Sequence, residues 1–122
     1  MRIAIFGTRK YDRQFLTQAN VAYGFDLDFL DVALSPTSAR LARGFDVACI
    51  FVNDIANRQV LEVLAEGGVG LVALRCAGYN NVDLVAAETL GLAVVRVPAY
   101  SPHAVSEFTI GLLLALDRKI HR

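Results

Sequence analysis

The chain has 122 residues, of which 55% are hydrophobic, and its 12 Lys and Arg residues balance its 12 Asp and Glu residues. This length and composition predict one compact domain with a substantial apolar core. Since no block of like charge is present, a nucleic-acid partner is not expected. The longest apolar stretch, residues 110–116, falls far below the roughly 20 residues of a membrane span, so no membrane passage is expected either.

Five apolar segments predict strands, and helical patterns separate them. The predicted strands are Ile3 to Phe6, Phe25 to Leu30, Val47 to Val52, Leu71 to Leu74 and Ala93 to Val97. Glycines precede the last four strands, at Gly24, Gly44, Gly67 to Gly70 and Gly91. A glycine just beyond a helix accepts the left-handed conformation that closes helices. The alternation is typical of βαβ units around a parallel sheet.

The apolar pattern of two strands indicates their place in that sheet. Residues 47–52 are apolar on both faces, as expected of a central strand, whereas residues 25–30 largely alternate, as expected of an edge strand. Five strands with right-handed crossovers predict an α/β fold of the flavodoxin-like, doubly wound type, with strand order 2-1-3-4-5. Ligands of such folds bind beyond the carboxyl ends of the strands, so the site is expected in the loops that follow them.

The end of the chain has a different character. Ser101 is a predicted N-cap and Pro102 a first-turn proline, ahead of one long helix from His103 to His121. Apolar residues cover nearly its whole circumference, which is typical of a helix buried on all sides. They are Phe108, Ile110, Leu112, Leu113, Leu114 and Leu116. We therefore expect residues 1–100 to form the domain and residues 101–122 an interdomain helix leading to protein absent from this fragment.

The two cysteines are Cys49, in a predicted strand, and Cys76, in a loop, without a Cys-x-x-Cys spacing or a histidine cluster. We expect both to be reduced thiols of a cytoplasmic protein, because structural disulfides are rare in that compartment. His103 and Glu107 are four residues apart on the predicted helix. Without a third ligand, this spacing is more typical of an exposed helical pair than of a metal site, and no metal is expected.

Two glycine-containing segments partly match the motifs of phosphate- or dinucleotide-binding loops. Residues 7–10, Gly-Thr-Arg-Lys, lack the further glycines of a phosphate-binding loop, which favours a tight turn with solvated cations, although Arg9 could attract an anion. Residues 68–73 match the Gly-x-Gly-x-x-Ala dinucleotide pattern. A predicted helix precedes them and a strand follows, which reverses the context that the fingerprint requires, so dinucleotide binding is not expected there.

The loop after the fourth strand, residues 75–83, reads Arg-Cys-Ala-Gly-Tyr-Asn-Asn-Val-Asp. Gly78 permits a close backbone approach, and consecutive amides just before a helix can bind a carboxylate or a phosphate. Arg75 could add charge, and Asn81 or Asp83 could cap the helix that follows. An ordinary capped loop explains the same residues equally well.

The loop after the fifth strand, residues 97–107, contains two prolines that stiffen the connection. They hold Tyr100 at the carboxyl edge of the predicted sheet, near the loop of Gly78. Its hydroxyl could donate to a substrate oxygen, or the ring could serve packing alone.

Together, residues 75–84 and 97–108 resemble the N-terminal domain of the D-isomer-specific 2-hydroxyacid dehydrogenase family. The strand and glycine rhythm of residues 1–100 is similar to that domain throughout. Within the family, the Tyr100-Ser101-Pro102 sequence resembles the D-lactate dehydrogenase branch.

The resemblance implies an oxidoreductase that reduces pyruvate to D-lactate with NADH, in a cleft between this domain and an NAD-binding Rossmann domain. By that likeness, the amides of Ala77 and Gly78 bind the substrate carboxylate, and Tyr100 contacts substrate or nicotinamide. Phe51 and Val52 border the pocket. Val105 would pack near the nicotinamide. The catalytic arginine, its acidic partner and the acid-base histidine of the family all lie in parts absent from this chain, which is therefore expected to be inactive alone.

Two departures from the family pattern affect the pocket and the domain junction. Phe51 stands where tyrosine can occur, which removes a hydroxyl from the pocket wall and leaves the choice of 2-oxo acid open. Phe108 follows Glu107 where many members have histidine.

Two alternatives remain beside a D-lactate dehydrogenase: another 2-hydroxyacid dehydrogenase of the family, and a stand-alone flavodoxin-like domain that binds a small molecule. A receiver domain would need acidic residues after the first strand, where residues 7–9 are Gly-Thr-Arg. A flavin site would need a hydroxyl-rich phosphate loop there. The apolar final helix also predicts that the isolated chain self-associates as a homo-oligomer.

Overall fold

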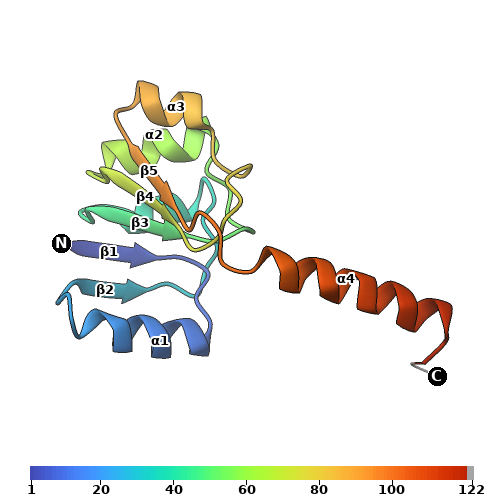
Figure 1. The fold of residues 1–122 in the computed structure, drawn as a ribbon. Helices are drawn as coiled ribbons and strands as arrows, with labels where there is room; N and C mark the ends of the chain where they lie inside the picture. Colours follow the sequence, from blue (N-terminus) through green and yellow to red (C-terminus); the bar gives the residue numbers. More distant parts are fainter. Residues whose placement is uncertain (121–122) are drawn as a thin grey trace.

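The computed structural model describes residues 1–120. Five strands form one sheet, and helical segments connect them along the chain (Figure 1). The strands are β1 (Arg2–Ile5), β2 (Asp26–Phe29), β3 (Val47–Ile50), β4 (Leu71–Leu74) and β5 (Ala93–Arg96). The helices are α1 (Lys10–Asn20), the 3-10 helix η1 (Ser38–Ala42), α2 (Arg58–Glu66), α3 (Leu84–Thr89) and α4 (Pro102–Asp117).

The strands pair in parallel, in the order β2-β1-β3-β4-β5, which confirms the predicted topology. Ile3 of β1 lies opposite Leu27 of β2 and Val47 of β3, so β1 is an inner strand. Because all strands run the same way, their carboxyl ends meet at one edge of the sheet. The loops after β1, β3, β4 and β5 therefore come together there.

Burial confirms the predicted central and edge strands. Every residue of β3 is buried, whereas the residues of β2 alternate between exposed and half-buried. β3 pairs with β1 and β4, and β2 pairs with β1 at the rim. A central strand that is covered on both faces needs apolar side chains on both, which is why the continuous apolar run lies in the middle.

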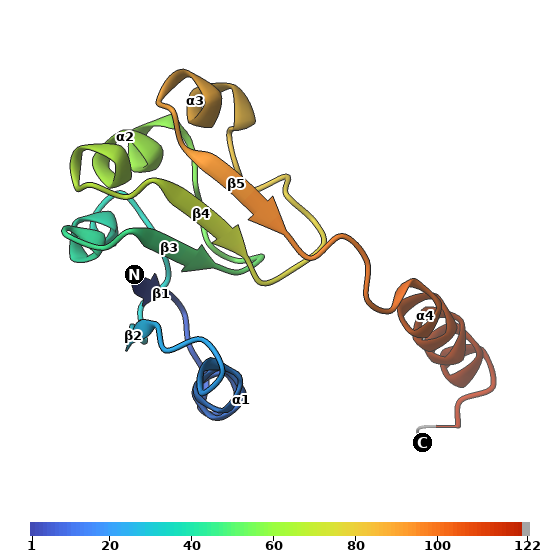
Figure 2. The same ribbon diagram turned by 60° about the vertical axis from the view of Figure 1, so that its left-hand side comes forward.

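Helices lie on both faces of the sheet (Figure 2). Ala4 and Phe6 point into the main core, which α2 and α3 cover with Leu61, Leu64 and Ala86, all fully buried. Alternate residues of a strand face opposite sides, so Ile3 and Ile5 face α1 instead. On that second face an apolar hollow of about 240 Å³ remains beside α1. Its walls include Leu16, Leu27, Val47, Cys49, Leu71 and Ala73.

Glycines close two of the helix-to-strand connections as predicted. Gly24 follows α1 with φ of +69° and Gly91 follows α3 with φ of +70°. Any other residue would be strained in this left-handed conformation. The chain can therefore reverse within a few residues and begin β2 and β5.

Some boundaries differ from the prediction. Phe6, Leu30 and Val97 lie just beyond their strands, and β3 ends at Ile50 instead of Val52. The backbone N–H of Phe51 donates to Asp54 Oδ2 at 2.6 Å, which turns the chain away from the sheet. The connection between β2 and β3 contains the short 3-10 helix η1 instead of a full α-helix.

The final helix has other bounds than predicted but is uncovered in this chain, as the sequence indicated. It begins at Pro102 and ends at Asp117, and His121 lies outside the described residues. α4 projects away from the sheet in both views (Figure 1, Figure 2), in agreement with the expectation that a surface outside residues 1–100 would cover it. Its large apolar side chains are 50–69% exposed, namely Phe108, Ile110, Leu112, Leu113, Leu114 and Leu116. Residues 1–100 therefore do not supply the surface that would cover this helix. Within residues 1–120, no helix combines the length and hydropathy that crossing a membrane requires.

Candidate carboxylate-binding site

Five of the six predicted site residues lie in loops at the carboxyl edge of the sheet, and the sixth, Val105, lies in α4. Ala77 and Gly78 follow β4, Tyr100 follows β5, and Phe51 and Val52 follow β3. The structure brings Ala77 and Tyr100 together in one hollow of about 230 Å³. The complete lining is Ala77, Pro98, Ala99, Tyr100, Ser101, Pro102 and Val105. No side chain of this lining carries a charge, and Tyr100 is 69% exposed.

The backbone of residues 76–78 presents donors without acceptors. Within residues 1–120, the N–H groups of Ala77 and Gly78 donate to no other group. The carbonyls beside them are occupied: Cys76 O accepts from Val97 N at 3.2 Å, and Ala77 O accepts from Arg96 Nη1 at 2.9 Å. Two consecutive free amides with constrained carbonyls are suited to bind an anion such as a carboxylate.

Asn81 and Asp83, which lie later in the same loop, stabilise the loop and the start of α3. Asn81 Nδ2 donates to the carbonyls of Phe51 at 3.0 Å and Asp54 at 2.9 Å. Asp83 is the residue that caps α3, because its Oδ1 accepts from Ala86 N at 2.9 Å. Asn81 thus links the loop after β4 to the loop after β3 instead of capping the helix.

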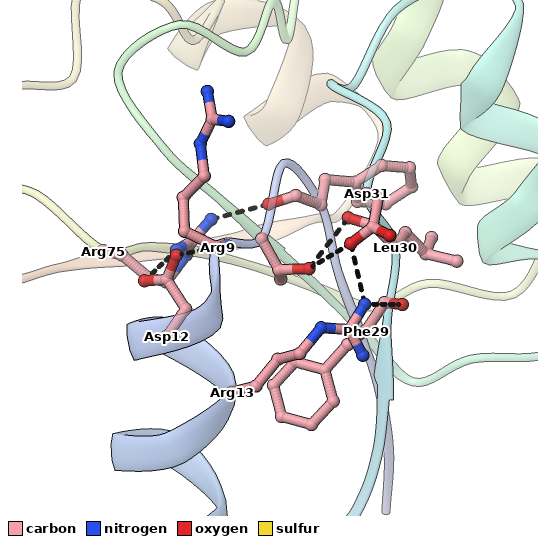
Figure 3. Close-up of polar contacts among 9 residues, drawn as sticks. Arg9, Asp12, Arg13, Phe29, Leu30, Asp31 and Arg75 are labelled. Carbon is pink, nitrogen blue, oxygen red and sulfur yellow. Dashed lines mark hydrogen bonds and ion pairs between the residues drawn. The ribbon is translucent and has the colours of Figure 1, made fainter.

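Arg75 is engaged away from the hollow. Its Nη1 lies 2.7 Å from Asp12 Oδ1, and its Nη2 donates to the carbonyl of Phe6 at 2.6 Å (Figure 3). The guanidinium also lies 5.4 Å from the centre of the Phe51 ring. The two side chains of the ion pair are each 14% exposed. Arg75 therefore ties β4 to β1 and to the first turn of α1, and the charge that the sequence suggested for the anion site is not available there.

Phe51 lines a second hollow, of about 320 Å³, on the β1 side of the edge. Gly7, Thr8, Arg9, Asp12 and Asp31 are among its other lining residues. Val52 is 49% exposed and belongs to neither lining. In this structure the sites of Phe51 and Tyr100 are thus separate, and a shared pocket remains a prediction.

Asp54 supports the loop of Phe51 and was missed from the sequence. It is 2% exposed, and its carboxylate accepts from the backbone N–H groups of Leu34 and Phe51, both at 2.6 Å. The signal for such a role is an aspartate directly after a fully apolar strand, where turn amides need an acceptor.

The segment of residues 7–10 forms the tight turn that was expected. Gly7 adopts φ of +60°, and Thr8 Oγ1 donates to the carbonyl of Leu30 and contacts Asp31 Oδ1 at 3.3 Å (Figure 3). Hydrogen bonding and charge from Arg13 lower the pKa of Asp31. Arg9 is exposed, and its backbone N–H donates to Asp12 Oδ2 at 2.8 Å.

The structure also places three further features that the sequence singled out. Residues 68–70 follow α2 and precede β4, which confirms the predicted order of elements and is the reverse of the order in a dinucleotide fingerprint. His103 and Glu107 are both exposed on α4, and no ion pair joins them in the described part of the chain. The two cysteines are buried and free. Burial raises the pKa of the Cys49 thiol to about 11 and also raises that of Cys76.

A family model described as D-isomer specific 2-hydroxyacid dehydrogenase, catalytic domain, matches residues 3–115. The chain therefore belongs to the D-isomer specific 2-hydroxyacid dehydrogenase family, as the resemblance of residues 75–84 and 97–108 predicted. The five-stranded parallel sheet and its strand order agree with solved structures of this family.

Individual members of this family match nearly the whole chain. The chain is 58% identical to a 2-hydroxyacid dehydrogenase homolog of Haemophilus influenzae and 52% identical to the D-lactate dehydrogenase of Escherichia coli, over all 122 residues. The apo structure of the Escherichia coli enzyme matches with a TM-score of 0.88, over 100% of this chain and 39% of that chain. The D-lactate dehydrogenase of Lactobacillus jensenii with NAD+ matches with a TM-score of 0.72 at 28% identity, over 98% and 37%. The chain spans 37% of the length of the first two relatives.

Proposed function

We propose that this chain is the substrate-binding half of an NAD-dependent D-2-hydroxyacid dehydrogenase, with D-lactate dehydrogenase as the specific activity of the full-length parent. The observation that carries the proposal is the pair of free amides at Ala77 and Gly78, of which Ala77 lines the same hollow as Tyr100. The 52% identity to the Escherichia coli D-lactate dehydrogenase supports the choice of pyruvate and D-lactate as substrate and product.

In this proposal residues 1–100 form the substrate-binding domain, and residues 101–122 lead into the NAD-binding domain. The amides of Ala77 and Gly78 bind the substrate carboxylate, and Tyr100 donates to the substrate or contacts the nicotinamide. Val105 packs near the nicotinamide. Phe51 and Val52 border the completed pocket once the second domain closes over the edge of the sheet.

The size of the hollow supports this division of labour. At about 230 Å³, it is smaller than the roughly 300–1,000 Å³ of sites for drug-sized ligands. It suits a three-carbon acid and the edge of a nicotinamide ring, whereas a whole dinucleotide needs a further domain. When bound, NADH supplies the hydride. This chain contributes orientation: its amides hold the carboxylate, and the apolar lining excludes water around the carbonyl carbon.

NADH oxidation with pyruvate tests the proposal, measured for this chain and for the full-length parent that contains it. We expect turnover with the parent and none with the chain, because the catalytic arginine, acidic residue and histidine of the family belong to the rest of the protein. Turnover with a different 2-oxo acid would retain the family activity and replace pyruvate. If none of the tested 2-oxo acids supports NADH oxidation by the parent, a stand-alone domain that binds a small molecule becomes the favoured function.

We further propose that the isolated chain forms homo-oligomers through α4. The support is the ring of large, exposed apolar side chains from Val105 to Leu116 on a helix with no covering surface in residues 1–100. Light scattering across a concentration series should show a mass above the monomer. Leu113→Glu should shift the chain to monomer, whereas Leu84→Glu, at an exposed position of α3, should not. A monomer at every concentration would contradict this proposal.

The two free, buried thiols are consistent with a cytoplasmic location of the parent, which we propose on that basis. Fractionation of the source cells with an antibody against the chain would test it.

A further inference from the structure

Arg96, at the last position of β5, is the cation that lies against the candidate carboxylate-binding loop. Its Nη1 donates to the carbonyl of Ala77 at 2.9 Å and to the carbonyl of Pro98 at 3.0 Å. Its guanidinium lies 5.2 Å from the centre of the Tyr79 ring. Within residues 1–120, no acidic side chain forms an ion pair with Arg96. Its charge is thus uncompensated, unlike that of Arg75.

The contact with Ala77 O acts on the amide of Gly78, because both belong to one peptide group. The chain contains no cis peptide bond, so this C=O and this N–H point in opposite directions. Arg96 is absent from the lining of the Tyr100 hollow and lies instead with Tyr79 and Leu84 in a neighbouring depression. A guanidinium that holds the oxygen on its own side therefore turns the N–H of Gly78 to the other side of the loop.

A cation on the oxygen also strengthens the donor. Hydrogen bonds to charged groups are stronger than neutral ones, and hydrogen bonds that share a peptide group polarise one another. A bound carboxylate at the Gly78 N–H would then interact with the Arg96 charge through one peptide group. The hollow has no charged side chain of its own, so this is the nearest way for the loop to compensate an anion.

The second contact joins the two loops that line the hollow. Pro98 follows β5 and leads to Tyr100, whereas Ala77 follows β4. One nitrogen of Arg96 bridges their carbonyls and so sets the separation of the free amides from the tyrosine. The side chain is long and exposed, but its two acceptors are backbone groups that stand in fixed positions.

We propose that Arg96 is a positioning residue for carboxylate recognition, which acts by orienting and polarising the Ala77–Gly78 peptide. This role rests on the proposed dehydrogenase function and extends it, since it names the residue that gives this site its preference for an acid. Arg96 therefore takes the role that the sequence suggested for Arg75, whose charge is neutralised by Asp12.

The kinetic test uses the full-length parent and compares Arg96→Met, Arg96→Lys and the control Arg58→Met, which removes an exposed arginine of α2. For Arg96→Met we expect an increase of about ten-fold in the KM for pyruvate, with kcat changed by less than about two-fold and an unchanged KM for NADH. Arg96→Lys keeps the charge and should recover part of the loss. Arg58→Met should behave as the wild type.

The decisive comparison is between pyruvate and its neutral methyl ester. Arg96→Met should lower kcat/KM for pyruvate and leave kcat/KM for methyl pyruvate nearly unchanged, because the ester lacks the charge that the peptide recognises. A loss of the same size for both substrates would mean that Arg96 supports only the loop structure, and an unchanged KM for pyruvate would overturn the role altogether.

A spectroscopic arm separates this proposal from the proposed function. In ¹H–¹⁵N spectra of the 122-residue chain, Arg96→Met should shift the Gly78 amide upfield in the proton dimension, while the amides of α2 stay in place. If the parent reduces no 2-oxo acid but the Gly78 amide shifts, the dehydrogenase assignment fails and the peptide contact stands. If the parent is active and neither the amide nor the KM responds, the proposal for Arg96 fails alone.

Discussion

The body of the domain and the helix α4 are both rich in apolar residues, but they use them in opposite ways. Leu61 and Leu64 of α2 are fully buried against the sheet, whereas Leu112 and Leu113 of α4 are 50% and 61% exposed. Apolar content alone thus does not decide burial. Tertiary neighbours decide it, and α4 has none among residues 1–100, as Figure 1 shows. The comparison implies that side chains in α2 stabilise this chain and those in α4 do not.

The largest expected effect separates the two helices directly. Leu64→Ala should lower the free energy of unfolding by about 2–5 kcal/mol, because it opens a cavity in the core. Leu113→Ala should change it by less than about 0.5 kcal/mol, since its side chain is mostly solvated. Urea titrations at low protein concentration would measure both. An equal loss in the two variants would mean that α4 is packed in solution.

Two ion pairs within residues 1–100 show the same contrast between shielded and exposed side chains. Arg75→Met leaves the carboxylate of Asp12 with little solvent and without its partner, and we expect a loss of about 2–4 kcal/mol. The matched control is Arg58→Met, which removes the exposed pair with Glu62, whose atoms lie 3.7 Å apart. Its expected cost is below about 1 kcal/mol. Thermal unfolding of both variants would measure these losses. An equal loss of stability in the control would contradict the expected difference between the two ion pairs.

The buried thiol of Cys49, on the face of the sheet beside α1, predicts a pH dependence of stability. Its folded pKa is raised from 9.0 to about 11, so stability from the neutral thiol is complete below pH 9 and is lost as the pH rises toward 11. The expected contribution is about 1–2 kcal/mol across this window. Urea midpoints from pH 7 to 11 should fall more steeply for the wild type than for Cys49→Ala. Parallel curves would contradict the assignment of the fall to this thiol.

The caps of α3 and α4 provide the smallest effect. Asp83→Ala removes a side-chain bond to Ala86 N and should cost about 1 kcal/mol. Ser101→Ala should cost less than about 0.5 kcal/mol, because Ser101 occupies the N-cap position of α4 without making a cap bond. Thermal melts would compare them. A larger cost for Ser101→Ala would place the serine hydroxyl in a bond that this structure does not have.

The sequence by itself determined the order of the strands and the family. Apolar runs and alternation report how many faces of a strand are covered, and glycines report where the backbone must turn left-handed. These are local properties, which is why β3 in the centre, β2 at the rim and the connections at Gly24 and Gly91 were all predictable. The motif of residues 75–83 likewise identified the loop with the free amides before its geometry was known.

Tertiary structure decided which side chains serve that loop. Arg75 lies next to the amides in sequence, but the sheet register directs it to Asp12, whereas β5 places Arg96 on the carbonyl of Ala77. The same long-range arrangement separates Phe51 from Tyr100 and leaves α4 uncovered. A guanidinium binds whichever acceptors the neighbouring strands bring within reach, and a helix is buried only where another surface meets it. Neither condition is written in the residues next to it along the chain.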